Sequence, residues 1–281
     1  MEQEKQLVEI NKAKSFWLGP WLIWLNIRKH NYLISNFIQR DLRLKYRNSV
    51  LGYFWSLLEP LMLSGVYFVL FIIIKGSPEP NYPLWVILGV IIWGHFSQSL
   101  NGSITSLTHN SELIKQVYFP REIFALTNLG SNLCMAGLSL LVTIPFMYYF
   151  EIYPTVYLLM VPLGLIMTSL LALGIGLGMA CLNVINRDIE HFFRFVIRAG
   201  FYLSPVIWTI DMVPTSRAAL STFMFLNPVT VPITMVRNGI DGRELGIDLI
   251  YVAYSVAFCI LSFLFGTMAF KRFEADVVKK L

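Results

Sequence analysis

Four basic side chains between residues 40 and 47 form the densest charge cluster that could bind a ligand. They are Arg40, Arg43, Lys45 and Arg47. An aromatic and apolar run follows directly, so the cations are predicted to lie at the headgroup level of a membrane. Each basic residue near an anionic membrane surface contributes about 1 kcal/mol of attraction.

One carboxylate, Glu59, lies inside the apolar run that follows the cluster. A charge at such a depth is costly, and a functional role is the default hypothesis. Two interpretations stay open. Glu59 either orients Arg43 or Arg47, or lines the entrance of a transport path; alternatively, it is a buried carboxylate satisfied by a neighbouring helix.

No catalytic or metal-binding pattern is present in the sequence. The four histidines are scattered, and neither HExxH nor GxSxG occurs. The dipeptide Gly-Lys is also missing, so any ATPase that drives the protein is expected in a separate chain. We therefore predict that the chain is no enzyme and holds no cofactor or metal. All three cysteines lie in apolar runs and are predicted to be buried hydrophobic residues: Cys134, Cys181 and Cys259.

The composition is that of an integral membrane protein. Of the 281 residues, 56% are hydrophobic and 14% are charged, whereas a soluble domain has about 25% charged residues. The net charge of +5 does not indicate nucleic-acid binding, because the basic residues cluster beside apolar segments. The acidic, mixed N-terminus does not have the form of a cleavable signal peptide.

An all-α membrane domain over residues 49–281 is predicted, because a bilayer core needs about 20 apolar residues as helix. Six spans are expected, at residues 50–74, 84–107, 123–150, 155–185, 192–210 and 249–270. With this topology, 18 of the 22 Lys and Arg residues face the N-terminal side. Both termini are therefore predicted to be cytoplasmic.

The segment at residues 212–239 is apolar enough to cross, yet prolines interrupt its middle. A seventh span would also place the basic C-terminus outside. We therefore predict two short re-entrant half-helices in the outer leaflet that turn at Asn227 and Pro228. Residues 1–48 are predicted to be cytoplasmic or interfacial, with an amphipathic helix starting near Ile34.

Two cytoplasmic loops are candidates for contact with a partner. Residues 109–122 can form a short helix capped by Ser111 or Asn110 and ended by Pro120. The charged turn at residues 186–190 is the second candidate. The alternative for both is a solvated connector.

Two further patterns lie in the spans. Gly174 and Gly178 form a small-residue stripe that lets helices approach closely, within one subunit or between two. Many aromatic residues lie near the spans; they either face lipid or line a path for sugars, whose apolar faces stack on rings. The candidates for a channel or its entrance are Tyr53, Trp55, Glu59, Tyr67, Trp93, Phe96, Tyr202 and Trp208.

Several motifs together resemble one family. In chain order they are LGYFWSLLEPL (51–61), ELIKQVYFPREIF (112–124), NxxNRD (183–188), YLSPVIW (202–208) and FLNPVT (225–230). From about residue 37 onward, the chain resembles the permease subunit of type-2 ABC exporters for bacterial surface polysaccharide, such as O-antigen, capsule or teichoic acid.

The resemblance implies a homodimer in the bacterial inner membrane with two ABC ATPase subunits that bind Mg-ATP. The implied substrate is a polysaccharide, with O-antigen expected first, on undecaprenyl diphosphate. Its head is expected at the basic cluster, and the outer gate at Phe225, Asn227 and Pro228. The resemblance implies that the interfacial helix and the loop around Glu112 receive the ATPase stroke. With the turn at residues 186–190 as a second contact, the predicted ATPase-coupling residues are Asn110, Glu112, Lys115, Arg121, Arg187 and Asp188.

Two other classes remain alternatives. An ion-driven secondary transporter usually has acidic residues in the middle of several spans, but the predicted third and fourth spans have none. A membrane glycosyl- or acyltransferase would need a carboxylate or histidine cluster at one membrane face. Asp211, Asp241 and Asp248 are predicted on the outer side, without a recognisable spacing.

Overall fold

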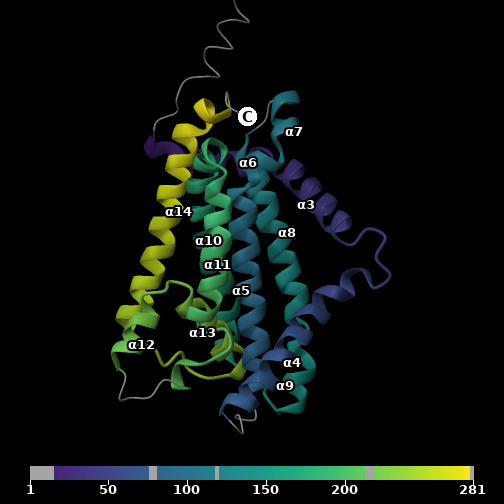
Figure 1. Cartoon of the computed structure of the whole chain (residues 1–281), viewed down its shortest axis with the longest axis vertical. Coiled ribbons are helices and arrows are strands. Elements are labelled where there is room, and N and C mark those ends of the chain that lie inside the picture. Colours follow the sequence, from purple (N-terminus) through teal and green to yellow (C-terminus); the bar gives the residue numbers. More distant parts are fainter. Residues whose placement is uncertain (1–15, 76–80, 118–119, 213–217, 279–281) are drawn as a thin grey trace, which may run out of the picture.

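The chain forms a bundle of long helices (Figure 1). The computed structural model describes residues 16–75, 81–117, 120–212 and 218–278. Every regular element within these ranges is helical, so the predicted all-α membrane fold is confirmed.

Five described helices are long and apolar enough to cross a bilayer. They cover Gly52–Leu70, Tyr82–Ile104, Glu122–Tyr149, Val156–Ile185 and Leu249–Val277. These correspond to the predicted first, second, third, fourth and last spans. The remaining predicted span falls on α11 (Asp188–Leu203), whose 16 residues extend about 24 Å against about 30 Å of hydrocarbon. A sixth crossing therefore stays a prediction.

The predicted boundaries of that span, 192–210, are wrong at both ends. At the start, Asn186 Oδ1 accepts a hydrogen bond from the backbone N–H of Asp188 at 3.0 Å, which satisfies one donor of the first turn and lets the helix begin earlier. At the end, Ser204 is extended because Pro205 follows it. A short 3₁₀ turn, η4 (Ile210–Met212), lies beyond.

The central helix is α10 (Met160–Ile185), which packs against α14 (Leu249–Val278) and α5 (Tyr82–Ile104). A Cβ atom at Gly266 of α14 would lie 1.8 Å from the carbonyl oxygen of Gly174. A Cβ at Gly174 would likewise lie 2.5 Å from the backbone of Ser262. The glycine stripe therefore serves close packing within the subunit.

The remaining long helices cover α5 and α10. α8 (Glu122–Leu140) continues through a turn into α9 (Thr143–Tyr149). α4 (Trp55–Lys75), preceded by the 3₁₀ turn η2 (Gly52–Phe54), packs on α5 and α8. A further 3₁₀ turn, η3 (Val156–Leu159), leads into α10.

The N-terminal part forms a separate arm along the bundle. It comprises η1 (Phe16–Leu18), α2 (Gly19–Lys29) and α3 (Asn31–Lys45). Figure 1 shows α3 leaving the bundle obliquely, and none of its residues is buried. Phe37 on its apolar face stacks on Phe124 of α8, with ring centroids 6.2 Å apart. The amphipathic helix is thus present and starts three residues before Ile34.

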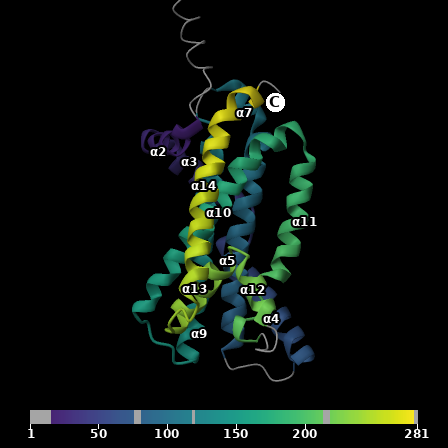
Figure 2. The same ribbon diagram turned by 90° about the vertical axis from the view of Figure 1, so that its left-hand side faces the viewer.

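The two ends of the bundle carry different elements. α14 ends at the same end as α2 and the short helices α6 (Ser106–His109) and α7 (Ser111–Gln116) (Figures 1 and 2). α12 (Ala218–Phe225) and α13 (Thr230–Asp241) lie at the opposite end. This arrangement is compatible with the predicted topology.

A buried ion cluster joins three helices at the end that carries α2. Lys271 Nζ of α14 lies 2.6 Å from Glu122 Oε2 of α8 and 3.1 Å from Glu274 Oε1. Asn26 of α2 donates to Glu122 Oε1 at 2.7 Å. The side chains of Lys271 and Glu122 are only 1% and 0% exposed. Glu122 falls in a predicted loop, and Lys271 and Glu274 follow the last predicted span, so the sequence pattern did not predict this cluster.

Replacing Lys271 with methionine should strongly destabilise the fold, because two buried carboxylates lose their counter-ion. Breaking one partner of a buried pair costs about 3–5 kcal/mol. Thermal unfolding of the purified protein in detergent measures the effect. Arg272→Gln is the matched control, because Arg272 is the exposed neighbour on the same helix. Equal melting temperatures for the two variants would contradict the prediction.

Candidate functional site

A groove of about 420 Å³ lies between α4, α5 and α11. It brings together three of the aromatic residues predicted to line a channel: Tyr67, Trp93 and Tyr202. The rest of its wall comprises Ser97, Gln98, Asn101, Arg194, Ile197, Arg198 and Phe201. The groove therefore combines aromatic, amide and guanidinium side chains and has no carboxylate among its lining residues.

The rings in the groove form one connected set. Phe201 lies 5.4 Å from Tyr67 and 6.2 Å from Trp93, measured between ring centroids. Gly200 makes room for this packing, since a Cβ there would lie 2.9 Å from Trp93 Cη2. Such ring faces beside amide groups can bind sugars, whose CH faces are apolar and whose hydroxyls need hydrogen-bond partners.

The other predicted channel residues lie elsewhere. Phe96 is buried behind Trp93, with ring centroids 5.4 Å apart, and does not line the groove. Tyr53 and Trp55 are exposed where the chain turns from α3 into α4. Trp208 donates its indole N–H to the Tyr202 carbonyl at 3.3 Å. Sequence reasoning missed the groove itself, although the polar second half of α5 gave a signal.

Glu59 lines a second, polar pocket of about 100 Å³. The cation in this pocket is Lys45, whose Nζ donates to Gln98 Oε1 at 3.3 Å. The predicted pairing of Glu59 with Arg43 or Arg47 is therefore wrong, and so is its burial, because Glu59 is exposed. Burial lowers the pKa of the Lys45 ammonium below its ordinary value, and the charge of Glu59 opposes that shift.

The other three cations of the cluster share one hollow of about 430 Å³ on α3. Arg40, Arg43 and Arg47 line it with Asn36, Gln39 and Leu44. Arg40 and Arg43 lie three residues apart and thus on one face of α3, whereas Lys45 lies on another; Arg47 follows in the turn after the helix ends. Arg40 also pairs with Asp41 at 2.8 Å, an exposed contact worth at most about 1 kcal/mol. This basic hollow can attract an anionic group.

The two loops predicted to contact a partner lie at the same end and are joined by one buried side chain. Asn183 donates to the Ile104 carbonyl at 3.3 Å and accepts from the backbone N–H of Glu190 at 3.1 Å. It thereby links α5, α10 and the start of α11. The exposed predicted contact residues at this end are Glu112, Lys115, Arg187 and Asp188.

The predicted cap of the short loop helix is wrong. No side-chain cap is present at the start of α7, because the Asn110 amide donates to the Ser106 carbonyl at 2.8 Å instead. This contact satisfies a free carbonyl of the preceding helix α6. Arg121 points towards α14, with Nη1 3.5 Å from the Glu274 carbonyl.

The turn between α12 and α13 is tied to its neighbours at the opposite end. Phe225 stacks on Tyr251 of α14, with centroids 4.4 Å apart. The Pro228 carbonyl accepts a hydrogen bond from Ser255 at 2.8 Å, and Asn227 Nδ2 donates to Ser204 Oγ at 2.7 Å. The three predicted gate residues thus form a packed junction.

Arg237 of α13 organises this end and was missed as a structural residue. Its guanidinium is buried and donates to the carbonyls of Trp85 at 2.9 Å, Trp208 at 3.0 Å and Val206 at 2.5 Å. Gly89 leaves space for it, since a Cβ there would lie 2.6 Å from Arg237 Nη2. An arginine that directly follows the largely apolar run from Val231 to Val236 was the available signal.

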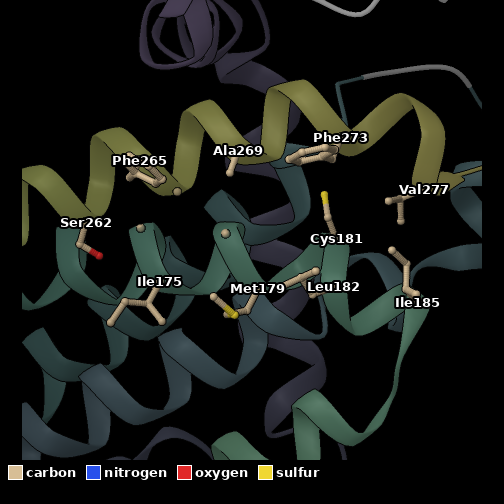
Figure 3. A pocket seen from close by; sticks show the side chains of 13 residues that line it. Ile175, Met179, Cys181, Leu182, Ile185, Ser262, Phe265, Ala269, Phe273 and Val277 are labelled. Carbon is tan, nitrogen blue, oxygen red and sulfur yellow. The ribbon is translucent and has the colours of Figure 1, made fainter. Parts of the chain in front are cut away.

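A fourth hollow, of about 480 Å³, is apolar and lies between α10 and α14 (Figure 3). Ile175, Met179 and Leu182 project from α10, opposite Phe265 and Phe273 of α14. No charged side chain lines it, so it suits hydrocarbon and not a polar substrate.

The predicted cysteine burial is confirmed at two positions and wrong at the third. Cys181 and Cys259 are buried, whereas Cys134 is exposed on α8. Within the described ranges, no group of three His, Cys, Asp or Glu side chains is placed to hold a metal ion.

Comparison with known proteins decides the family. The ABC-2 type transporter family matches residues 32–240, which is most of the chain. The chain belongs to the ABC-2 type transporter family. The match covers α3, the groove, both partner loops and the two half-helices.

Relatives of this ABC-2 protein include permeases of known export systems. An O-antigen export system permease protein RfbA of Klebsiella pneumoniae is 30% identical over 226 residues, which cover 79% of this chain and 85% of the relative. RfbA of Myxococcus xanthus is 27% identical, with 70% and 75% covered. The polysialic acid transport protein KpsM of Escherichia coli is 24% identical, with 76% and 84% covered.

Family membership and the five apolar helices make this ABC-2 protein a multi-pass protein of the bacterial inner membrane. The family is a transporter component and not itself an enzyme. The predicted family and the predicted membrane location are thereby confirmed.

Neutralising Glu59 should lower the pKa of Lys45 further, because the carboxylate favours the charged ammonium. In Glu59→Gln, amine acylation of Lys45, measured by mass spectrometry across a pH series, should therefore begin at lower pH. Lys29 on α2 serves as the internal reference. An unchanged or upward-shifted Lys45 profile would show that Glu59 does not act on it.

Replacing Arg237 with glutamine should destabilise the protein by about 2–4 kcal/mol, because buried carbonyls lose charged donors. Thermal unfolding in detergent measures the loss. Arg272→Gln is the control, since Arg272 is exposed on α14 and a surface substitution should cost less than about 1 kcal/mol. Similar losses in both variants would contradict the role of the three carbonyl bonds.

Proposed function

We propose that this chain is the permease subunit of an ATP-driven exporter of lipid-linked surface polysaccharide, with O-antigen as the first candidate. The groove between α4, α5 and α11 carries this proposal, because its rings and amides suit a sugar chain. The names of the RfbA and KpsM relatives support the same substrate class.

The substrate head meets the basic hollow on α3 first. Arg40, Arg43 and Arg47 offer three guanidinium groups in one hollow, and arginine binds phosphate oxygens through paired N–H donors. A diphosphate, as in undecaprenyl diphosphate, fits this chemistry. Lys45 faces the neighbouring pocket with Glu59 and Gln98, beside the route from the hollow to the groove.

The glycan then passes through a channel between two copies of the chain. The groove is lined by α11, which runs on the side of the bundle away from α2 and α3 (Figure 2). α4 and α11 form its walls, and both expose much apolar surface. Two grooves that face one another would enclose a path shielded from lipid, which is the homodimer we propose.

Two ATPase subunits dock at the end that carries α7 and the turn at residues 186–190. This end is cytoplasmic in the predicted orientation, and Mg-ATP binds in those partner subunits. Asn183 connects the turn to α5 and α10, so a push on the loops reaches the groove walls. The junction around Asn227 and Pro228 would form the outer gate.

Neutralising Arg40 and Arg43 together should reduce export strongly. At about 1 kcal/mol for each cation, the loss corresponds to about 30-fold weaker head binding. Surface polysaccharide is quantified in cells that co-express the ATPase, at matched permease levels. The control is Arg28→Gln/Lys29→Gln on α2, which removes two cations at the same end but outside the hollow.

The proposal has clear outcomes that would contradict it. Unchanged export in the Arg40/Arg43 variant would remove the head-binding role of the hollow. Transport driven by a proton gradient without an ATPase would overturn the ABC mechanism as a whole. Copurification of an ATPase together with ATP-dependent flux is the expected result.

A further inference from the structure

Arg198 lies deep along α11 for a charged residue. It is ten residues beyond Asp188, where the helix begins, which corresponds to about 15 Å along the axis. A cation at this depth is costly unless it pairs or faces a water-filled cavity. Arg198 is exposed, and within the described part of the chain it makes no ion pair. Its position in the groove wall shows how it stays solvated.

Arg194 lies one turn closer to the helix start. It contacts Glu190 at 3.0 Å and His191 Nδ1 at 3.2 Å, both on the exposed face of the same helix. Such an i,i+4 pair contributes little and is easily exchanged for a stronger anion. Both guanidinium groups line the groove.

The groove-facing stripe of α11 follows helical spacing and changes character along its length. Arg194, Ile197 and Arg198 come first, and Phe201 and Tyr202 follow one turn later. Trp93 and Gln98 of α5 form the facing wall. Cations and rings thus occupy successive turns of one groove, about 5 Å apart per turn.

This sequence of groups matches a specific chemical unit. Arginine binds phosphate through a bidentate fork, whereas rings bind the apolar face of a sugar. In a glycosyl diphosphate, a single oxygen atom joins the sugar ring to the first phosphate, so both chemical groups are adjacent. The basic hollow on α3 differs, because no aromatic side chain lines it; it suits the phosphates alone.

We propose that this groove binds the glycosyl-diphosphate junction of the lipid-linked glycan. Arg194 and Arg198 hold the diphosphate, and Tyr202, whose side chain is exposed, stacks on the first sugar. The inference rests on the proposed function and adds a second binding site for the substrate, after the hollow on α3.

Binding by the full-length permease in neutral phosphatidylcholine nanodiscs tests this inference without an ATPase. The probe is a short-chain prenyl diphosphate with one N-acetylglucosamine. The comparison probes are an uncharged alkyl N-acetylglucosaminide, inorganic pyrophosphate and an acidic oligosaccharide without lipid. The variants are Arg194→Gln/Arg198→Gln and Tyr202→Ala, with Arg28→Gln/Lys29→Gln as the matched double control.

The arginine double variant should bind the sugar-diphosphate probe at least about tenfold more weakly than the unaltered protein does. Its affinity for the uncharged glycoside should not change. Tyr202→Ala should weaken binding of both probes, and the α2 control should weaken neither. Arg194→Lys/Arg198→Lys should recover part of the loss, because charge returns without the fork. Melting temperatures confirm that each variant is folded.

Three results would overturn the inference. The first is unchanged binding of the sugar-diphosphate probe to the arginine double variant. The second is arginine-dependent binding of the acidic oligosaccharide but not of the diphosphate probe, which would assign the cations to charges on the polymer. The third is binding of pyrophosphate as tight as that of the sugar-diphosphate probe, together with unchanged probe binding to Tyr202→Ala, which would remove the sugar from the site.

Failure of the binding site can be distinguished from failure of the proposed exporter function. Arginine-dependent binding by a protein that exports no glycan with its ATPase would keep the site and remove the exporter. Active export with unaltered probe binding in the arginine double variant would keep the exporter and remove the site.

Discussion

A charged side chain in an apolar helix bundle must be paired with a polar group or solvated by water, and this constraint shapes both ends of the molecule. At one end, Lys271 binds Glu122 and Glu274 between α8 and α14. At the other end, Arg237 binds three backbone carbonyls, including those of Trp85 and Val206. The paired charges fix the helices to one another. The groove between the two ends keeps its cations, Arg194 and Arg198, exposed.

Much of the architecture follows from apolar length and breaker residues. The spans that contain α5, α10 and α14 were predictable because each is a long uncharged run. The helical break at residues 226–229 followed from Asn227 and Pro228. The end of α11 was misplaced because apolar residues continue past Pro205, where backbone geometry and not hydropathy decides.

The candidate site was predictable only in its residue types. Tyr67, Trp93 and Tyr202 were sensible aromatic candidates, but hydropathy gives no rotation of a helix about its axis when most faces are apolar. The cation beside Glu59 was mispredicted for the same reason, since Lys45 and Arg43 lie on different faces of α3. Pairing across helices, as in Lys271 with Glu122, depends on tertiary contact that no local pattern contains.

The backbone contact of Gly174 with Gly266 has a consequence for motion. Helices locked at this spacing cannot slide past one another without steric clash, so α10 and α14 act as one rigid column. The walls of the groove differ: α11 has no buried residue, and only 11% of the first apolar segment is buried. Any widening of the groove therefore falls to α4 and α11, which can swing against a stationary column.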